Sequence, residues 1–501
     1  MVNSPKLFTT QNALNSAIKN ICDILRRSNC AGALQYIPEL TWMLFLRILD
    51  HQEMCQEIKC QNLGMKFIPI LVSPYRWRDW GSPNGWKRIE LQMTEIGAFL
   101  RFVNEELLPY LKRLKYHPNA TQIQKVISEI LFSVERVGVD TEKNFIDVLD
   151  KVDQIHTDNI DKTHIFPISQ VYEGLLLKMG EKSNDGGQFF TPREIVRFMV
   201  RAIAPQLGET VYDPCCGTSG FLVQAYEFML ESLGENFTEE QLRILKNQTL
   251  YGREKENLIY PIALANLLLH GIEQPNLWHG NTLTNTPIYD GLFDNSPDSF
   301  DVILTNPPFG GKEGKEVQNY FNFPTSSTQI LFLQHILDSL KPGGRCAIVL
   351  DEGVLFRRNE TAFVKTKQKL LRECNLWCIV SLPSGVFVNA GTNLKTNILF
   401  FTKGEATEKI WYYDLSDIKV TKKTPLTGDK FDDFFRLLPE KGQRDRSWTI
   451  SRQVIEERGY DLKAVNPYIN IPSKTRTKEE LLSLIEAKNR EFIEALASLK
   501  K

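Results

Sequence analysis

Four consecutive residues after a short apolar run are the first candidates for chemistry in this 501-residue sequence: Asn306-Pro307-Pro308-Phe309. The preceding run, FDVILT, is typical of a buried strand. Two successive prolines fix the backbone and remove two N–H donors, which leaves carbonyl oxygens free to accept hydrogen bonds. Asn306 adds a side-chain acceptor, and Phe309 adds a flat apolar face for stacking. These residues suit an exocyclic amino group on a planar base; a rigid turn after a strand is the plainer alternative.

An eight-residue loop is the second candidate. It lies between the apolar run TVY and the helical pattern FLVQAYEFML, and it reads Asp213-Pro214-Cys215-Cys216-Gly217-Thr218-Ser219-Gly220. Gly217 and Gly220 would let the backbone approach a ligand closely at a helix N-terminus. The loop matches neither GxxxxGK[ST] nor GxGxxG, which excludes a Walker loop and a dinucleotide fingerprint. Asp213 favours a positively charged ligand, and a tight turn is the alternative.

Three further positions follow or precede strands. Glu254 ends the run TLYGRE, where an acid would accept hydrogen bonds from two ribose hydroxyls by analogy with dinucleotide-binding folds. Asn281 ends LWHGN, and it would contact an adenine edge or serve as a turn residue. The segment QFFTPR combines Gln188 and two aromatics with a helix-capping Thr191 and a first-turn Pro192. It is a candidate lid over a cofactor, or simply a helix start.

The elements that must position these residues alternate between strands and helices. This alternation predicts an α/β fold with a doubly wound, mostly parallel sheet, in which ligands bind at the carboxyl ends of the strands. The last two strand-like runs have no helix between them and predict an antiparallel hairpin. The seven runs are TVYDP, TLYGRE, LWHGN, FDVILTNPP, RCAIVLDE, LWCIVSLP and TNILFFTKG.

The rest of the chain divides into three further parts. Apolar residues at helical spacing predict helices over 11–28 (capped by Thr10), 37–54 and 119–137. We therefore expect a helical domain over 1–160, the α/β domain over 161–415, a polar extension over 416–475 and a C-terminal helix over 476–501. That last helix carries an alternating three- and four-residue spacing, which predicts either a partner-docking seam or packing on its own chain. The seam consists of Leu482, Ile485, Asn489, Phe492, Leu496 and Leu499.

Composition excludes several classes of protein. With 42% hydrophobic and 24% charged residues, the chain is neither mostly disordered nor a disulfide mini-protein. Sixty Lys and Arg against 61 Asp and Glu give a formal net charge of −1, so no overall basic bias points to nucleic acid, although a local basic face would suffice. Nine cysteines without a CxxC…CxxC pattern, and an N-terminus without an apolar stretch, favour a cytoplasmic protein with free thiols.

Other kinds of site receive little support. No metal-ligand spacing occurs, so no metal is expected. No apolar run approaches the roughly 20 residues that span a bilayer, so no membrane association is expected. A group of basic residues would contact DNA phosphates or form a solvated helix face: Arg357, Arg358, Lys365, Lys367 and Lys369.

The motifs together carry a family resemblance. The segments QFFTP, DPCCGTSGF, YGRE, TNPPFGG and SLPSGVF…TNILFFTKG occur in this order. The chain resembles the N6-adenine DNA methyltransferases and, more narrowly, the modification (M) subunit of type I restriction-modification systems. The resemblance covers nearly the whole chain. It implies a class I methyltransferase fold, S-adenosylmethionine as cofactor, and methyl transfer to N6 of adenine in duplex DNA. It also implies a separate specificity (S) subunit, two M subunits to one S, and leaves open whether a restriction (R) subunit joins.

The resemblance also assigns roles. It implies that residues 306–309 are catalytic, that Asp213, Gly217 and Gly220 belong to the cofactor loop, and that Glu254 binds the ribose. Gln188, Thr191 and Pro192 would hold the methionine part of the cofactor. The family often carries Asp where this chain has Asn281, so the role of that residue stays open.

The implied mechanism begins with a flipped adenine, because a base inside a duplex cannot present its amino group to a pocket. Phe309 would stack on the base, while the Asn306 side-chain oxygen and the Pro307 carbonyl accept the amino hydrogens. Direct transfer needs no covalent intermediate, so Cys215 and Cys216 are expected to be packing residues. The alternatives are a stand-alone N6-adenine methyltransferase, an enzyme acting on RNA or protein glutamine, and a non-catalytic scaffold.

Overall fold

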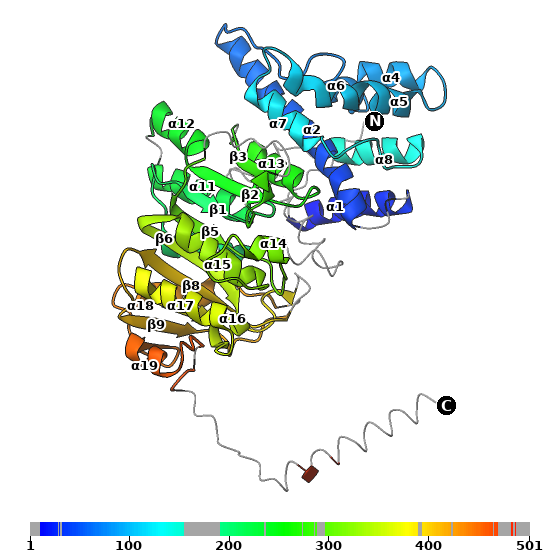
Figure 1. Ribbon diagram of the computed structural model, residues 1–501. Coiled ribbons are helices and arrows are strands. Elements are labelled where there is room, and N and C mark those ends of the chain that lie inside the picture. Colours follow the sequence, from blue (N-terminus) through cyan, green and yellow to red (C-terminus); the bar gives the residue numbers. More distant parts are fainter. Residues whose placement is uncertain are drawn as a thin grey trace.

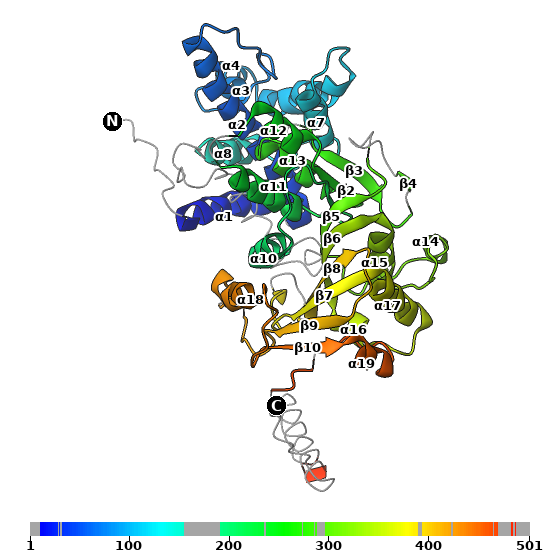
Figure 2. The same cartoon turned by 90° about the vertical axis from the view of Figure 1, so that its left-hand side faces the viewer.

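The computed structural model describes residues 11–28, 30, 33–154, 191–234, 237–272, 274–284, 286–287, 296–388, 393–421, 424–463, 465–468, 482–483 and 486. A helical part packs beside an α/β body (Figures 1 and 2). Thr10, Gln188 and most of the expected C-terminal helix and its seam lie outside the described residues. Among the described residues, no helix is long and apolar enough to cross a membrane.

A ten-stranded sheet, in the order β10-β9-β7-β8-β6-β5-β1-β2-β3-β4, forms the centre of the α/β body. The pairs along β6-β5-β1-β2-β3 are all parallel, whereas β8 runs antiparallel to both its neighbours, and β4 and β10 are antiparallel edge strands. The doubly wound, mostly parallel fold and the hairpin of β7 with β8 are therefore confirmed. The strands are β1 Val211–Asp213, β2 Leu250–Glu254, β3 Asn276–Asn281, β4 Thr286–Pro287, β5 Phe300–Thr305, β6 Leu340–Asp351, β7 Cys374–Ser381, β8 Thr396–Lys403, β9 Lys409–Asp414 and β10 Ser447–Ser451.

Helices cover both faces of the sheet, which is why its central strands are nearly continuous apolar runs. In β5, Val302 and Leu304 belong to the core on one face and Ile303 to the core on the other. Figure 2 shows α10, α11 and α18 on one side and α15, α16 and α17 on the other. These helices are α10 Arg193–Ile203, α11 Gly220–Leu233, α15 Thr328–Ser339, α16 Glu352–Phe356, α17 Thr361–Glu373 and α18 Asp432–Leu437; α12 Glu239–Asn247 and α14 Lys315–Gln318 are peripheral.

The first part of the chain is helical, as its apolar spacing predicts. The three expected helices correspond to α1 Gln11–Arg27, α2 Ala33–Asn62 and α7 Gln122–Ile130. Helix α7 ends seven residues earlier than expected, because backbone N–H groups beyond it find side-chain acceptors elsewhere: Val137 donates to Asn104 and Gly138 donates to Glu39. The other helices are α3 Trp77–Trp80, α4 Trp86–Gln92, α5 Ala98–Arg101, the π-helix η1 Phe102–Leu107, α6 Leu108–Arg113, the 3₁₀-helix η2 Leu114–Tyr116 and α8 Glu142–Asp153.

Helix α13, Tyr260–Leu269, joins the two parts. All ten of its residues are buried. On one side it packs against α2 and α7. On the other side the Tyr260 hydroxyl donates to the Leu277 carbonyl of β3, at 3.3 Å. A helix that is apolar all round must be covered on every side, and the helical part supplies half of this cover.

The region expected to be a polar extension contributes to the fold. Sequence analysis assigned no element to residues 416–475, but β10, the 3₁₀-helix η6 Gly428–Phe431, α18 and α19 Arg452–Glu457 lie there. The apolar clusters that form these elements are short and are separated by charged residues. The sequence therefore shows no clear helix or strand periodicity there. Phe198 of α10 stacks on Phe431 with ring centroids 4.1 Å apart, and contacts Phe434 edge-on at 4.8 Å. Phe198 also contacts Phe400 of β8 edge-on at 5.8 Å, so this aromatic cluster anchors α10 to the sheet.

We predict that Phe198→Ala destabilises the α/β body by about 3–5 kcal/mol, because a buried ring at the centre of an aromatic cluster leaves a cavity. The measurement is the denaturant-unfolding midpoint. Arg197→Ala is the control, since its exposed ion pair with Glu194 contributes at most about 1 kcal/mol. Equal midpoints for the two variants would show that the cluster does not anchor α10.

Candidate active site

The candidate residues meet at the carboxyl edge of the sheet. Asp213, Glu254 and Asn281 end β1, β2 and β3, and Asn306 directly follows β5. Strands β1 and β5 are neighbours, and the chain order reverses between them, because β2 and β3 extend the sheet in the opposite direction from β5 and β6. Open α/β sheets bind ligands at such a reversal.

The loop after β1 has the tight backbone that its glycines predict. Gly217 and Ser219 adopt positive φ values of 54° and 66°, and α11 begins at Gly220. A Cβ added at Gly220 would meet no atom within 4 Å, so open space lies beside this helix start. The buried Asn266 of α13 supports the loop by donating to the Thr218 carbonyl at 2.8 Å.

Glu254 binds the same loop from the neighbouring strand. Its Oε2 accepts from the Gly217 N–H at 2.9 Å and its Oε1 from the Glu256 N–H at 2.8 Å, and the Lys255 backbone N–H is a third donor. Burial raises the pKa of Glu254 to about 7. The two carboxylate oxygens offer about four lone-pair positions, so three backbone donors leave room for one further hydrogen bond from a ligand.

Asp213 links the loop to the segment after β5. The Thr305 hydroxyl donates to its Oδ1 at 2.7 Å, and the N–H of Cys215 donates to the same atom at 3.2 Å. Burial raises the pKa of Asp213 to about 7, although both hydrogen bonds oppose this shift. Sequence reasoning missed Thr305, the residue immediately before Asn306, because its partner lies 92 residues away in the chain.

Asn306 has one satisfied and one unsatisfied end. Its Nδ2 donates to Thr191 Oγ1 at 3.0 Å, whereas Oδ1 is buried and accepts no hydrogen bond from any residue that the structure describes. Leaving a buried acceptor unpaired costs about 1–3 kcal/mol. Such a cost is common at sites where a ligand supplies the missing partner, here a donor such as an amino group.

The rest of the diproline segment is partly covered. Pro307 is buried, while Pro308 and Phe309 are half-buried. The Phe309 ring contacts Phe387, from the loop after β7, edge-on with centroids 5.3 Å apart. Phe387 ends the SLPSGVF segment that contributes to the family resemblance, but sequence analysis assigned this residue no role in the site. The contact orients the Phe309 ring from one edge.

The helix cap expected at Thr191 is wrong, whereas Asn281 has the contact of the turn alternative. Thr191 does not cap α10: the helix begins at Arg193, Pro192 occupies the N-cap position without a side-chain cap, and the Thr191 hydroxyl contacts Asn306 instead. Asn281 uses its Oδ1 to accept from the Leu283 N–H at 3.0 Å, which is the geometry of a turn residue.

The two cysteines of the loop are poorly suited to act as nucleophiles. Cys216 is buried, and Cys215 Sγ lies 3.1 Å from the Thr305 hydroxyl. Burial raises the pKa of both thiols well above their ordinary value, so both stay protonated at neutral pH. Within the described part of the chain, no three His, Cys, Asp or Glu side chains are grouped to hold a metal.

The proposed basic group does not form one phosphate-binding surface. Lys367 is only 1% exposed and donates to the carbonyl oxygens of Leu355 and Arg357, both at 2.8 Å. Lys369 forms an ion pair with Asp338. The prediction that Lys367 contacts phosphate is therefore wrong. The Lys367 ammonium instead binds carbonyl oxygens at the C-terminal end of α16.

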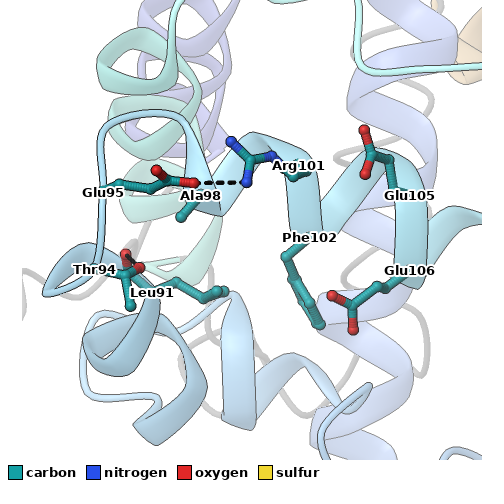
Figure 3. A pocket seen from close by; sticks show the side chains of 8 residues that line it. All are labelled: Leu91, Thr94, Glu95, Ala98, Arg101, Phe102, Glu105 and Glu106. Atoms are coloured by element: carbon teal, nitrogen blue, oxygen red, sulfur yellow. Dashed lines mark hydrogen bonds and ion pairs between the residues drawn. The ribbon is translucent and has the colours of Figure 1, made fainter.

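A pocket of about 500 Å³ lies away from these residues, among α4, α5 and η1 (Figure 3). Its wall carries three carboxylates, Glu95, Glu105 and Glu106, against one guanidinium, Arg101, which pairs with Glu95 at 2.6 Å. An acidic pocket repels phosphate, so it is unsuited to DNA.

Comparisons with known proteins agree with this geometry. Residues 14–152 match the family described as the HsdM N-terminal domain, and residues 163–477 match the N-6 DNA methylase family. The chain is 35% identical over 481 residues to the type I restriction enzyme EcoEI methylase subunit of Escherichia coli, covering 91% of each chain. It is 30% identical to the EcoKI methylase subunit of Escherichia coli strain K12, covering 86% of this chain and 76% of that one.

Solved structures show the same relationship. One, from a study of complex assembly and conformational transition in a type I R-M system, is 36% identical with a TM-score of 0.73 and covers 98% of both chains. The crystal structure of a modification subunit from Vibrio vulnificus YJ016 is 32% identical with a TM-score of 0.78, covering 93% of this chain and 99% of that one. The chain thus belongs to the N-6 DNA methylase family and, within it, to the modification subunits of type I restriction-modification systems, which are adenine-specific DNA methyltransferases.

Proposed function

We propose that this modification subunit transfers a methyl group from S-adenosylmethionine to N6 of an adenine flipped out of duplex DNA, with sequence choice supplied by a separate S subunit. The observation that carries the proposal is the buried, unpaired Oδ1 of Asn306 beside two prolines. An exocyclic amino group supplies the donor that this oxygen lacks.

The residues at the ends of β1 and β2 fit the cofactor. S-adenosylmethionine supplies an activated methyl group on a positively charged sulfur. Glu254 retains room to accept a hydrogen bond from the ribose, and the open space at Gly220 allows close approach to the helix start. Asp213, behind the loop, adds negative charge that favours a cation. Gly217, Thr218 and Ser219 would complete the binding loop, with Pro192 and Gln188 upstream.

The diproline segment would hold the base. Asn306 Oδ1 and the Pro307 carbonyl accept the two N6 hydrogens, which draws the nitrogen lone pair out of conjugation with the ring and aims it at the methyl group. Phe309, braced by Phe387, stacks on the flipped base. Positioning of this kind accounts for most of the expected rate acceleration.

The partners follow from the relatives. One solved relative comes from a study of complex assembly in a type I R-M system. The relative from Escherichia coli is a methylase subunit of a type I restriction enzyme. We therefore propose an S subunit as partner of this chain, with two M subunits and one S subunit on duplex DNA. The C-terminal helix expected from sequence is the proposed docking element, and the assembly would act in the cytoplasm.

Asn306→Ala should lower the rate of methyl transfer by about 10²-fold or more, because the oriented acceptor for the amino group is lost. Cofactor affinity should stay within twofold of the unaltered protein. Labelled-methyl transfer to DNA by the chain with its S subunit measures the rate, and calorimetry measures affinity. Asn119→Ala, at an exposed position of the helical part, is the control. Unchanged transfer in Asn306→Ala would remove the proposed site.

Cofactor affinity should rise between pH 6 and pH 8. The pKa of Asp213 and of Glu254 is raised to about 7, so both carboxyls are largely protonated at pH 6, and a cationic ligand must displace protons to bind. Affinity then falls by up to about tenfold per pH unit below 7 for each group that must ionise. Calorimetry in buffers of different ionisation enthalpy counts the released protons.

Two controls isolate the charge effect in this titration. S-adenosylhomocysteine has the same amino and carboxyl groups but an uncharged sulfur, so its affinity should vary less with pH. Asp213→Asn should weaken binding of S-adenosylmethionine and flatten its pH profile. Identical pH profiles for the two ligands would contradict the proposed role of the buried carboxyls.

Site-specific methylation should require the S subunit. Plasmid DNA treated with this chain alone should stay unmethylated, whereas addition of the S subunit should produce N6-methyladenine at one sequence, read by direct sequencing of modified bases. Light scattering of the mixture should give the mass of two M and one S. Specific methylation by the chain alone would instead establish a stand-alone methyltransferase.

A further inference from the structure

The amide of Asn306 has two chemically different ends. Its Oδ1 accepts hydrogen bonds and its Nδ2 donates them, and a half-turn about χ2 exchanges the two positions. The N6 lone pair leaves conjugation with the ring when acceptors bind the two amino hydrogens. The amino group therefore needs to face the acceptor Oδ1. If Nδ2 faced the base, its hydrogens would oppose those of N6. The productive orientation therefore needs a group that pairs with Nδ2 while Oδ1 faces the base.

We propose that Thr191 is a positioning residue that holds the Asn306 amide with Oδ1 toward the amino group. Its hydroxyl is the partner of Nδ2, at 3.0 Å, and this contact leaves Oδ1 unpaired and buried. The proposal rests on the proposed catalytic function of Asn306. It gives Thr191 a role toward the base, in place of the cofactor contact that the family resemblance implies.

The chain around Thr191 is rigid enough for this task. The residue before a proline is restricted to extended backbone, so Pro192 limits the conformations of Thr191. Helix α10 starts at the next residue, and its apolar face is buried, including Ile195, Phe198 and Met199. A hydroxyl on such a support keeps its place when Asn306 loses or gains a ligand.

A hydroxyl can donate as well as accept, so the turned amide would still find a partner in Thr191. The bound amino group decides between the two states, because only the state with Thr191 accepting satisfies Nδ2 and presents Oδ1 to the base. Without the hydroxyl, no described residue replaces Thr191 as the partner of Nδ2, and the half-buried amide is driven to turn or shift away.

Three variants of Thr191 test the role. Thr191→Val keeps the shape and removes the hydroxyl, Thr191→Ala removes it without any risk of a clash, and Thr191→Ser keeps it. In the complex with the S subunit and DNA, at saturating cofactor, Val and Ala should lower single-turnover methyl transfer about tenfold or more. Ser should stay within about threefold. The Kd for S-adenosylmethionine should stay within twofold in all three.

Other outcomes would overturn the proposal. Weakened cofactor binding in Val and Ala, with unchanged single-turnover transfer at saturation, would make Thr191 a cofactor contact only. Unchanged transfer and affinity in Val and Ala would give the hydroxyl no role. Thermal unfolding of each variant checks the fold, and Ala remains informative if Val does not fold.

A double variant separates this proposal from the proposed function. In an Asn306→Ala background, Thr191→Ala should cause no further loss of transfer, because the amide that it positions is absent. An additional tenfold loss would show that Thr191 acts independently of Asn306. Full activity of Asn306→Ala itself would defeat the proposed function, whatever the Thr191 variants do.

Discussion

The hydrogen bond from the Thr305 hydroxyl to Asp213 connects the two halves of the site, and the remaining geometry depends on it. It joins the ends of adjacent strands β5 and β1, so the loop that follows one strand and the diproline segment that follows the other have a fixed separation. Glu254 extends the connection to β2 by accepting from the Gly217 N–H. Three neighbouring strand ends thereby form one rigid edge, on which a donor and an acceptor of one carbon can be held together.

Polar groups at this edge are buried, and nearly all of them are paired within the protein. Burial of Asp213 and Glu254 raises the pKa of both carboxyls, because the low dielectric disfavours their charged forms. Asn306 bears the cost of burial as an unpaired oxygen. In the proposed complex, a cation and an amino donor would lower both costs, so the same free energy that destabilises the edge by itself would favour binding.

The sheet could be predicted from sequence because seven of its strands are dense apolar runs that end at polar residues. Strands β4, β9 and β10 were not predicted, because β4 has only two residues and charged segments flank β9 and the short edge strand β10. Of the site, the residue types at strand ends were predictable, but their partners were not: Thr305 finds Asp213, and Thr191 finds Asn306, across about a hundred residues of chain. The local pattern predicted a helix cap at Thr191, but Pro192 occupies that position. It also predicted an exposed charge at Lys367, whose side chain is buried.

Helix α13 sets a limit on how the molecule can be divided. Its outer surface is as apolar as its inner one, and α2 and α7 cover it. An excised α/β body would expose that surface to water and invite aggregation. Trimming this subunit to a minimal catalytic fragment would therefore sacrifice its solubility.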